Sequence, residues 1–205
     1  MIYNGEAAPA VPIAILLGTI TGASDDRLHD LIRAARTGDA AALSTVIDRV
    51  RLVAREIWPD IRSAEVAGVP GHRPGPVNPL VLAVTHELAG IRGWDHAPGA
   101  LQRIRPAPEA KVAGSRDPQA EAATLEWVRA NRGAAIVLVD DVLRSGSTLR
   151  ACATAIHATG ERRPIFAIAI AARGTGALSA DSSAGRVLLE PCIHAYLPAR
   201  DVDIE

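Results

Sequence analysis

Residues 136–149, Ile-Val-Leu-Val-Asp-Asp-Val-Leu-Arg-Ser-Gly-Ser-Thr-Leu, constrain the fold of this 205-residue chain more than any other stretch. Four aliphatic residues end in two adjacent carboxylates, Asp140 and Asp141, and a short loop around Gly146 precedes a helical pattern. Because both faces of the run are apolar, it predicts a buried strand of a parallel sheet. The loop then lies at the carboxyl end of that strand, where open α/β sheets bind their ligands.

The loop has the composition of an anion-binding site. Gly146 lets the backbone approach a phosphate closely, and Ser145, Ser147 and Thr148 offer hydroxyl groups. The N–H groups at the start of the following helix point in the same direction. Two carboxylates beside such a loop suit a ligand with both a phosphate and a diol, such as a ribose 5-phosphate. A buried strand whose acids cap the next helix remains the alternative, whereas a Walker loop is excluded because no Gly-Lys-Ser/Thr follows the glycine.

The composition favours a cytoplasmic enzyme. Hydrophobic residues make up 48% of the chain, which is enough for a sizeable core. The net charge of −1 argues against a protein that binds nucleic acid by charge alone, although nucleic acid stays an open partner. The two cysteines have no metal-binding spacing, which is typical of a reduced compartment. The apolar run at 11–20 is too short to span a bilayer and resembles no signal peptide, so we expect no membrane association.

Strands alternate with helices along the chain, which predicts an α/β fold with a parallel twisted sheet flanked by helices. The predicted strands cover residues 11–20, 61–70, 136–139, 164–172 and 186–196, and the predicted helices cover 24–38, 40–57, 79–89, 119–130 and 148–158. Residues 97–119 are polar and rich in proline, which predicts a long mobile loop. We expect an N-terminal strand and helical region at 1–60, packed on an α/β core at 61–205 that includes a C-terminal hood segment.

The stretch at 136–149 resembles the signature of type I phosphoribosyltransferases, which bind 5-phosphoribosyl-1-pyrophosphate (PRPP). That signature has four apolar residues, two acids, two apolar residues, two mostly small hydroxylic residues, Gly, any residue and Thr. The chain departs from it at Arg144, where the family more often has Thr, Ala or Asp. The closest resemblance is to the ComF-like branch and covers roughly residues 26–172. Shorter matches support it at 28–39, 69–74, 101–105 and 128–131.

Two departures from that branch are clear. These 205 residues contain no cysteine-rich zinc module of the kind that often precedes this domain. The family's Arg-Gly-Phe-Asn run after the first loop is reduced here to Pro76-Val77-Asn78. The chain therefore resembles the branch mainly in its PRPP motif and in the order of its weaker motifs.

The resemblance implies a type I phosphoribosyltransferase-like fold with a small hood and N-terminal helices, and it implies roles for particular residues. Asp140 and Asp141 would hold the ribose diol and, through the ribose or water, Mg²⁺. The 5-phosphate would be held by Arg144, Ser145, Gly146, Ser147 and Thr148. Pyrophosphate would meet Gly71, His72 and Arg73 in the first loop. Lys111 and Arg116 would reach pyrophosphate as catalytic residues when the mobile segment closes as a lid.

These roles predict a Mg²⁺-dependent phosphoribosyltransferase of nucleotide metabolism, with a homodimer as the default assembly. It would transfer the phosphoribosyl group of PRPP to a nitrogen of a base or amine and release pyrophosphate. A guanidinium cannot accept a proton, so Arg144 disfavours 6-oxopurine acceptors, whose enzymes use an Asp base at that position. Two alternatives keep the fold: a non-catalytic PRPP- or nucleotide-sensing regulator, and a protein of DNA uptake (competence). A nucleotide-binding interaction module without PRPP is a third.

Five further residues bear on these alternatives. His194 and Tyr196 lie where this family often folds a hood over the acceptor, and are candidates to shape that pocket. Arg103 and Arg105 either line the lid or keep it soluble. Cys152 is expected to be a small buried residue.

Overall fold

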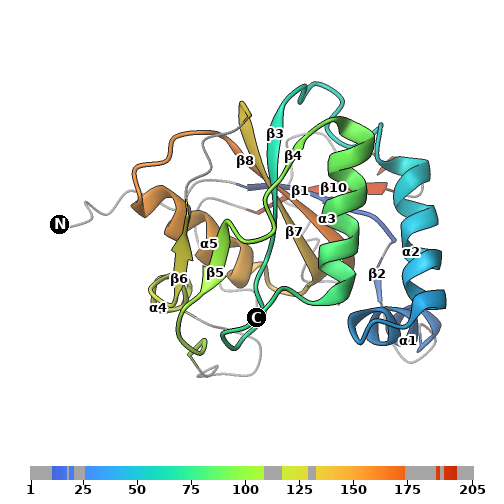
Figure 1. Ribbon diagram of the computed structural model, residues 1–205, viewed down its shortest axis with the longest axis horizontal. Helices are drawn as coiled ribbons and strands as arrows, with labels where there is room; N and C mark the ends of the chain where they lie inside the picture. Colours follow the sequence, from blue (N-terminus) through green and yellow to red (C-terminus); the bar gives the residue numbers. More distant parts are fainter. Residues whose placement is uncertain are drawn as a thin grey trace.

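A computed structural model describes residues 11–17, 19–20, 26–108, 117–128, 133–173, 188–189 and 192–197. Within these residues, eight strands form one central sheet (Figure 1). Along the sheet they follow the order β4 (Asp95–His96), β3 (Ala64–Gly68), β7 (Ala135–Leu143), β8 (Ile165–Arg173), β1 (Val11–Ile15), β10 (Cys192–Leu197) and β9 (Leu188–Leu189), while β2 (Thr19–Ile20) pairs with β8. The five strands from β4 to β1 are parallel to one another, which confirms the predicted parallel α/β sheet.

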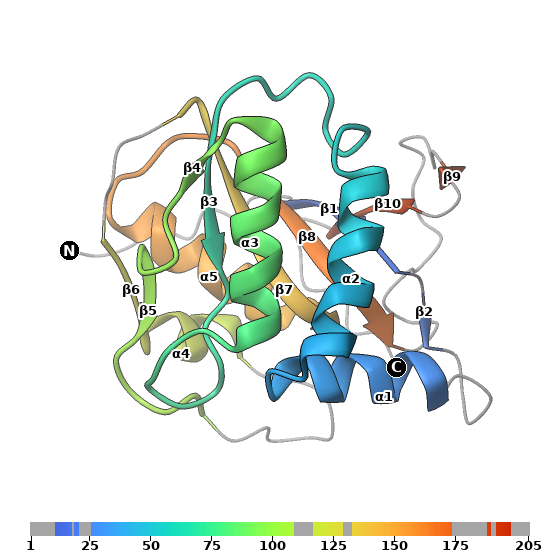
Figure 2. The same ribbon diagram turned by 45° about the vertical axis from the view of Figure 1, so that its right-hand side comes forward.

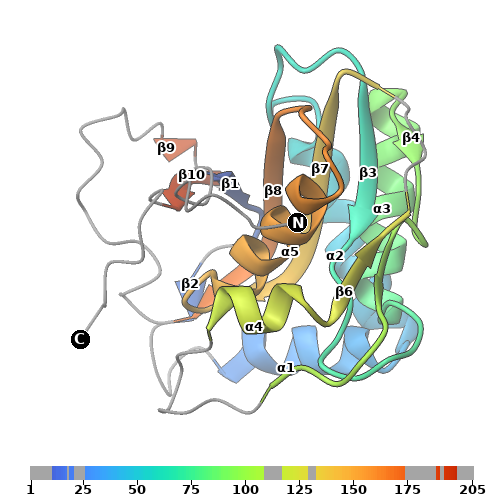
Figure 3. The same ribbon diagram turned by 90° about the vertical axis from the view of Figure 1, so that its left-hand side faces the viewer.

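Helices cover both faces of this sheet. Helices α2 (Ala40–Val53) and α3 (Pro79–Arg92) lie on one face and α5 (Ser147–Ala158) lies on the other (Figure 3). Strand β7 is apolar on both sides because its residues alternate between two cores, with Val137 and Val139 facing α2 and α3, and Ile136 and Leu138 facing α5. Helix α1 (Asp26–Arg36) crosses the carboxyl ends of the parallel strands (Figure 2).

A second, two-stranded antiparallel sheet corrects two predictions. It consists of β5 (Leu101–Arg103) and β6 (Leu125–Trp127), and it lies with the short helix α4 (Pro118–Ala122) beside α5 (Figure 3). The predicted helix at 119–130 is right only at its start, where α4 is helical, and wrong from β6 onward. Leu125 and Trp127 are buried on either side of exposed Glu126, which is the alternation of a strand. The predicted loop at 97–119 is wrong in part, since β5 lies within it.

Local sequence signals set the ends of α3. The side chain of Asn78 caps the helix by accepting from Val81 N, Pro79 occupies its first turn, and Gly93 ends it in the left-handed region at a φ of 65°. In its last turn, the Arg92 guanidinium donates to five backbone carbonyls, those of Ala54, Arg55, Ile57, Trp58 and Ile61. These carbonyls belong to residues that follow the end of α2 at Val53. The observed helix therefore ends one turn before the end predicted at residue 57.

Arg163, just before β8, holds two carboxylates at the amino ends of β3 and β8. Its Nη1 lies 3.0 Å from Glu65 Oε2, and its Nη2 lies 2.8 Å from Glu161 Oε2. Both carboxylate side chains are at least nine-tenths buried. The pKa of Glu161 is lowered to about 2, chiefly because its carboxylate accepts hydrogen bonds from the Arg163 side chain.

The terminal strands join the main sheet. β1 lies between β8, to which it is parallel, and β10, to which it is antiparallel. The backbone of Cys192–Leu197 is therefore a sheet strand, while the side chains of His194 and Tyr196 and the segments flanking β9 and β10 lie outside the described residues. None of the described helices combines the length and apolar character needed to cross a bilayer.

Candidate functional site

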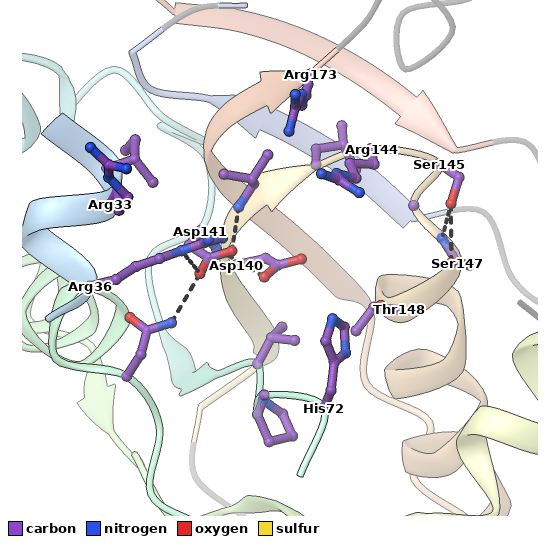
Figure 4. Close-up of a pocket in the computed structure, with 18 of the residues that line it drawn as sticks. Arg33, Arg36, His72, Asp140, Asp141, Arg144, Ser145, Ser147, Thr148 and Arg173 are labelled. Atoms are coloured by element: carbon purple, nitrogen blue, oxygen red, sulfur yellow. Dashed lines mark hydrogen bonds and ion pairs between the residues drawn. The ribbon is translucent and has the colours of Figure 1, made fainter. Parts of the chain in front are cut away.

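A cavity of about 610 Å³ opens at the carboxyl ends of the parallel strands (Figure 4). This is the edge of the sheet at which the sequence predicts a ligand site. The cavity is lined from the first loop by Val69, Pro70, Gly71 and His72, from β7 and its loop by all residues from Asp140 to Thr148, from α1 by His29, Ile32, Arg33 and Arg36, and by Asn78 and Arg173. The two acids and all five predicted phosphate-binding residues therefore share one cavity with two of the three predicted pyrophosphate-binding residues.

Asp141 is held by side chains that come from two helices. Its Oδ2 lies 2.5 Å from Arg36 Nε of α1 and accepts a hydrogen bond of 3.0 Å from Asn78 Nδ2, at the start of α3. Its Oδ1 accepts from Val142 N at 2.7 Å. The Asp141 side chain is only 14% exposed, and Figure 4 shows Arg36 reaching it from α1. The negative charge of Asp141 is thus compensated within the protein, and its orientation is fixed.

Asp140 is in a different electrostatic state. Burial, followed by the negative charge of Asp141, raises the pKa of its carboxyl to about 8, against the lowering effects of a hydrogen bond from Asp141 N and of Arg36. At neutral pH without ligand, the protonated form of Asp140 is therefore favoured. A neutral carboxylic acid beside a carboxylate offers a hydrogen-bond donor and an acceptor to adjacent ligand hydroxyls.

The phosphate-type loop turns sharply between β7 and α5. Gly146 adopts a φ of 73° in the left-handed region, which Gly adopts without steric cost. The N-cap residue Gly146 has no side chain to cap α5, and Ser147 N makes a long hydrogen bond of 3.4 Å to Ser145 Oγ. The N–H groups at the start of α5 can therefore serve a bound anion. Ser145 Oγ donates to Ser147 Oγ at 3.1 Å, and Arg150 Nη2 donates to the carbonyl of Ser145 at 3.2 Å. The loop is therefore already ordered around the glycine.

The first loop follows β3 and faces this helix start across the cavity. Val69 N donates to the carbonyl of Val139 at 2.8 Å, which continues the β3–β7 pairing up to the loop. Gly71 and His72 line the cavity, whereas Arg73 is exposed and lies outside the set of described residues that line it. The predicted catalytic residues Lys111 and Arg116 lie outside the described residues.

Sequence reasoning missed the contributions of α1, Asn78 and the end of β8. Arg33 and Arg36 come from a segment whose sequence predicts only a helix, and Asn78 belongs to the run in which the chain departs from the ComF-like pattern. Arg144 and Arg173 also line the cavity. The described lining thus carries four arginines against two aspartates in a chain of net charge −1, which favours an anionic ligand.

The acids do not form a metal site by themselves. The described residues contain no group of three or more His, Cys, Asp or Glu side chains that could hold a metal ion. Mg²⁺ is commonly bound by one or two carboxylates together with the phosphates of a substrate. The two aspartates fit this arrangement, in which the phosphates and hydroxyls of the ligand supply most of the oxygen atoms around the metal.

Comparison with protein-family models gives no match to this chain, and comparison with curated proteins gives none either. The interpretation of the cavity therefore depends on its geometry and on the residues that form it.

Proposed function

We propose that this protein is a phosphoribosyltransferase that binds PRPP with Mg²⁺ and transfers the phosphoribosyl group to a nitrogen nucleophile. One observation carries the proposal: a carboxylate pair, a glycine-turned helix start and a second backbone loop line a single cavity of about 610 Å³. That volume lies within the range usual for small-molecule sites. PRPP has three chemically distinct parts: a 5-phosphate, ribose hydroxyls and a pyrophosphate. The cavity offers a suitable set of residues for each part.

The 5-phosphate suits the loop at 144–148. The N–H groups at the start of α5 and the hydroxyls of Ser145 and Ser147 supply neutral donors, and Arg144 adds a positive charge. The ribose hydroxyls suit the carboxyl groups of Asp140 and Asp141. Pyrophosphate suits the backbone of Gly71 and His72 on the β3 side. The proposal thus uses both loops and the acids between them.

Phosphoribosyl transfer breaks the bond between ribose C1 and the pyrophosphate oxygen and forms a bond between C1 and the acceptor nitrogen, which loses a proton. Positive charge develops on the ribose ring in the transition state. Within the cavity, the nearby carboxylate of Asp141 stabilises that charge, and the two loops hold the ribose between fixed ends. Bound Mg²⁺ would neutralise charge on the departing pyrophosphate, with Asp140 and Asp141 holding it through the ribose or water.

A second function on the same fold is PRPP sensing without transfer. The ion pair between Arg36 and Asp141 favours it, because a ligand that takes over Asp141 must weaken this link to α1. Ligand binding would then release or reorient α1, which is a response that a sensor requires. Release of pyrophosphate separates the two functions, since only the transferase produces it.

The proposal is tested by calorimetric titration of PRPP into the protein with and without Mg²⁺. The test variant is D140N/D141N, and the matched control is D48N, which removes an exposed carboxylate from α2. We expect Mg²⁺-dependent binding to the wild type and to D48N, and none to the double variant. Pyrophosphate release is then measured with a panel of nitrogen bases and amines.

Failure of the wild type to bind PRPP with Mg²⁺ would refute the proposal. Binding with no pyrophosphate release from any acceptor would favour the sensor. Equal binding by wild type and D140N/D141N would show that the ligand does not use the acids, and would also count against both functions.

A further inference from the structure

A buried ion pair lies between the two ligand loops, which are the first loop after β3 and the phosphate-type loop between β7 and α5. None of the contacts to a ligand assigned above involves this pair. Arg103 on β5 and Glu121 on α4 have side chains that are 0% exposed, and Arg103 Nη2 lies 3.1 Å from Glu121 Oε1. Removing two charges from water costs several kcal/mol per ion, and their mutual attraction offsets this only when further hydrogen bonds are made. The remaining partners of the pair therefore indicate what it holds in place.

Arg103 reaches the first ligand loop. Its Nε donates to the carbonyl of Gly71 at 2.5 Å, and its Nη1 donates to Thr124 Oγ1 at 2.5 Å. The Thr124 hydroxyl donates in turn to the backbone carbonyl of Glu121 at 2.6 Å, which leaves its oxygen lone pairs for Arg103. A planar guanidinium with three separate acceptors defines the position of the Gly71 peptide, which lines the cavity.

Glu121 reaches the second ligand loop. Thr148 Oγ1 donates to Glu121 Oε1 at 3.3 Å, and the same oxygen accepts from Arg103 Nη2. Thr148 stands in the first turn of α5 and lines the cavity at the predicted phosphate end. Arg103 also compensates the charge of Glu121, which would otherwise repel a phosphate bound beside Thr148.

We propose that Arg103 and Glu121 are a positioning pair that sets the distance between the Gly71 peptide and Thr148, and hence between the two ends of the ligand. Gly71 follows β3 and Thr148 follows β7, so strand pairing alone does not fix the loops beyond the sheet edge. The unit formed by β5, α4 and β6 supplies that link. The identity of the ligand as PRPP rests on the proposed function, whereas the link between the loops is independent of it.

The test variant is R103M/E121M, which removes both charges and both links and leaves no unpaired buried ion. Replacing a buried ion pair by apolar residues of similar volume is often neutral for stability, so the variant separates positioning from folding. Hydrogen exchange of the ligand-free protein is followed in peptides 69–73 and 144–149, with 165–173 as the reference. Calorimetry gives the dissociation constants of PRPP and ribose 5-phosphate.

We expect faster exchange in both loop peptides, unchanged exchange in the reference peptide, and dissociation constants raised about tenfold, which corresponds to one net hydrogen bond. The single variant R103M should bind more weakly than the double variant, because it leaves the charge of Glu121 beside the phosphate. If adding E121M to R103M restores part of the lost affinity, the two residues act together, because two independent structural losses would add instead.

The matched control is R105M. Arg105 is exposed and donates to the carbonyl of Ala123 at 2.6 Å, so it touches the same unit but contacts neither loop in any described interaction. It should leave exchange and binding unchanged. If R103M/E121M does not fold, R103K serves instead, because it keeps a charge beside Glu121 but loses the planar fork to Gly71, and it should still loosen peptide 69–73.

A folded double variant, or R103K in its place, whose loops exchange as in the wild type would overturn the inference. If the wild type binds neither PRPP nor ribose 5-phosphate, the proposed function fails, and exchange in the ligand-free protein still decides whether the pair positions the loops. Faster exchange confined to α4 and the small sheet would also overturn it, since the pair would then stabilise only its own unit.

Discussion

The raised pKa of Asp140 predicts how the stability of the ligand-free protein depends on pH. The folded protein holds a proton on Asp140 up to about pH 8, whereas an unfolded chain releases it near the ordinary value of 3.8. The unfolded state therefore binds fewer protons in this window, and the contribution of Asp140 to stability falls as pH rises from about 4 to 8. The substitution D140N removes the ionisation while its amide oxygen can still accept from Asp141 N.

The size of the effect follows from the pKa values. Each pH unit inside the window shifts the folding free energy by ~1.4 kcal/mol, so wild type and D140N should diverge by up to ~2.7 kcal/mol between pH 5 and pH 7. The acids titrate as a pair, so we expect about 1–3 kcal/mol. The stability of D140N relative to that of the wild type should thus rise steadily with pH.

Urea denaturation at pH 5, 6, 7 and 8 measures this difference, because titrating groups that are not coupled to Asp140 contribute equally to both proteins and cancel. D48N, at an exposed position of α2, is the control and should run parallel to the wild type. If the free energy of unfolding of D140N minus that of the wild type stays constant or falls with rising pH, the reasoning is refuted. That result would mean that Asp140 is ionised in the folded protein.

Three further substitutions test separate parts of the structure. R163M leaves the buried carboxylates of Glu65 and Glu161 without their shared partner, and should lower the free energy of unfolding by about 3 kcal/mol at pH 7 in urea denaturation. Because the pKa of Glu161 is depressed, the share of this loss in stability that is due to Glu161 should shrink as pH falls from about 4.5 towards 2. G146A places a side chain at a φ of 73° and should lower the free energy of unfolding by about 1–2 kcal/mol in thermal denaturation. It should also weaken the binding of ribose 5-phosphate in a calorimetric titration. Unchanged stability and unchanged binding would contradict the left-handed turn. R92A removes the donor to five carbonyls and should lower stability by about 3 kcal/mol in guanidinium denaturation, whereas a loss under 0.5 kcal/mol would show that water replaces it.

The strand, loop and helix at 136–149 are the part of the site that the sequence predicts best. The apolar run, the two acids and Gly146 are contiguous, so one periodicity and one turn residue define their geometry. β7 does extend past the acids to Leu143, and α5 begins at Ser147. The prediction that Cys152 is buried is confirmed, since its side chain is 0% exposed on α5.

Residues that approach the acids from distant segments could not be predicted in this way. Arg36 is one of several basic residues on an amphipathic helix, and nothing local distinguishes it from Arg33 until α1 is placed across the sheet edge. Asn78 reads as a helix cap, which it is, and its second role at Asp141 depends on the packing of α3 against β7. Tertiary contacts of this kind leave no periodic signal.

Arg103 shows why a polar segment was misread. Charged residues among prolines predict a solvated loop, because a charge is rarely buried without a partner. The partner, Glu121, lies in a segment read as one long helix, so neither half of the pair indicated burial by itself. In β5, Leu101 and Arg103 are buried on either side of an exposed residue. Because one of the two buried residues is charged, the sequence does not show the apolar alternation that predicts a strand.

The position of β1 has a consequence for how the chain reaches its native state. Val11–Ile15 are synthesised well before their parallel partner β8, where Ile13 lies opposite Ala167. Until β8 emerges from the ribosome, an apolar strand remains without the neighbour that satisfies its backbone. Contacts between such distant segments close slowly, because a long loop must lose its entropy first. We therefore expect sheet completion to limit the refolding rate, and nascent chains that stop before β8 to depend on chaperones.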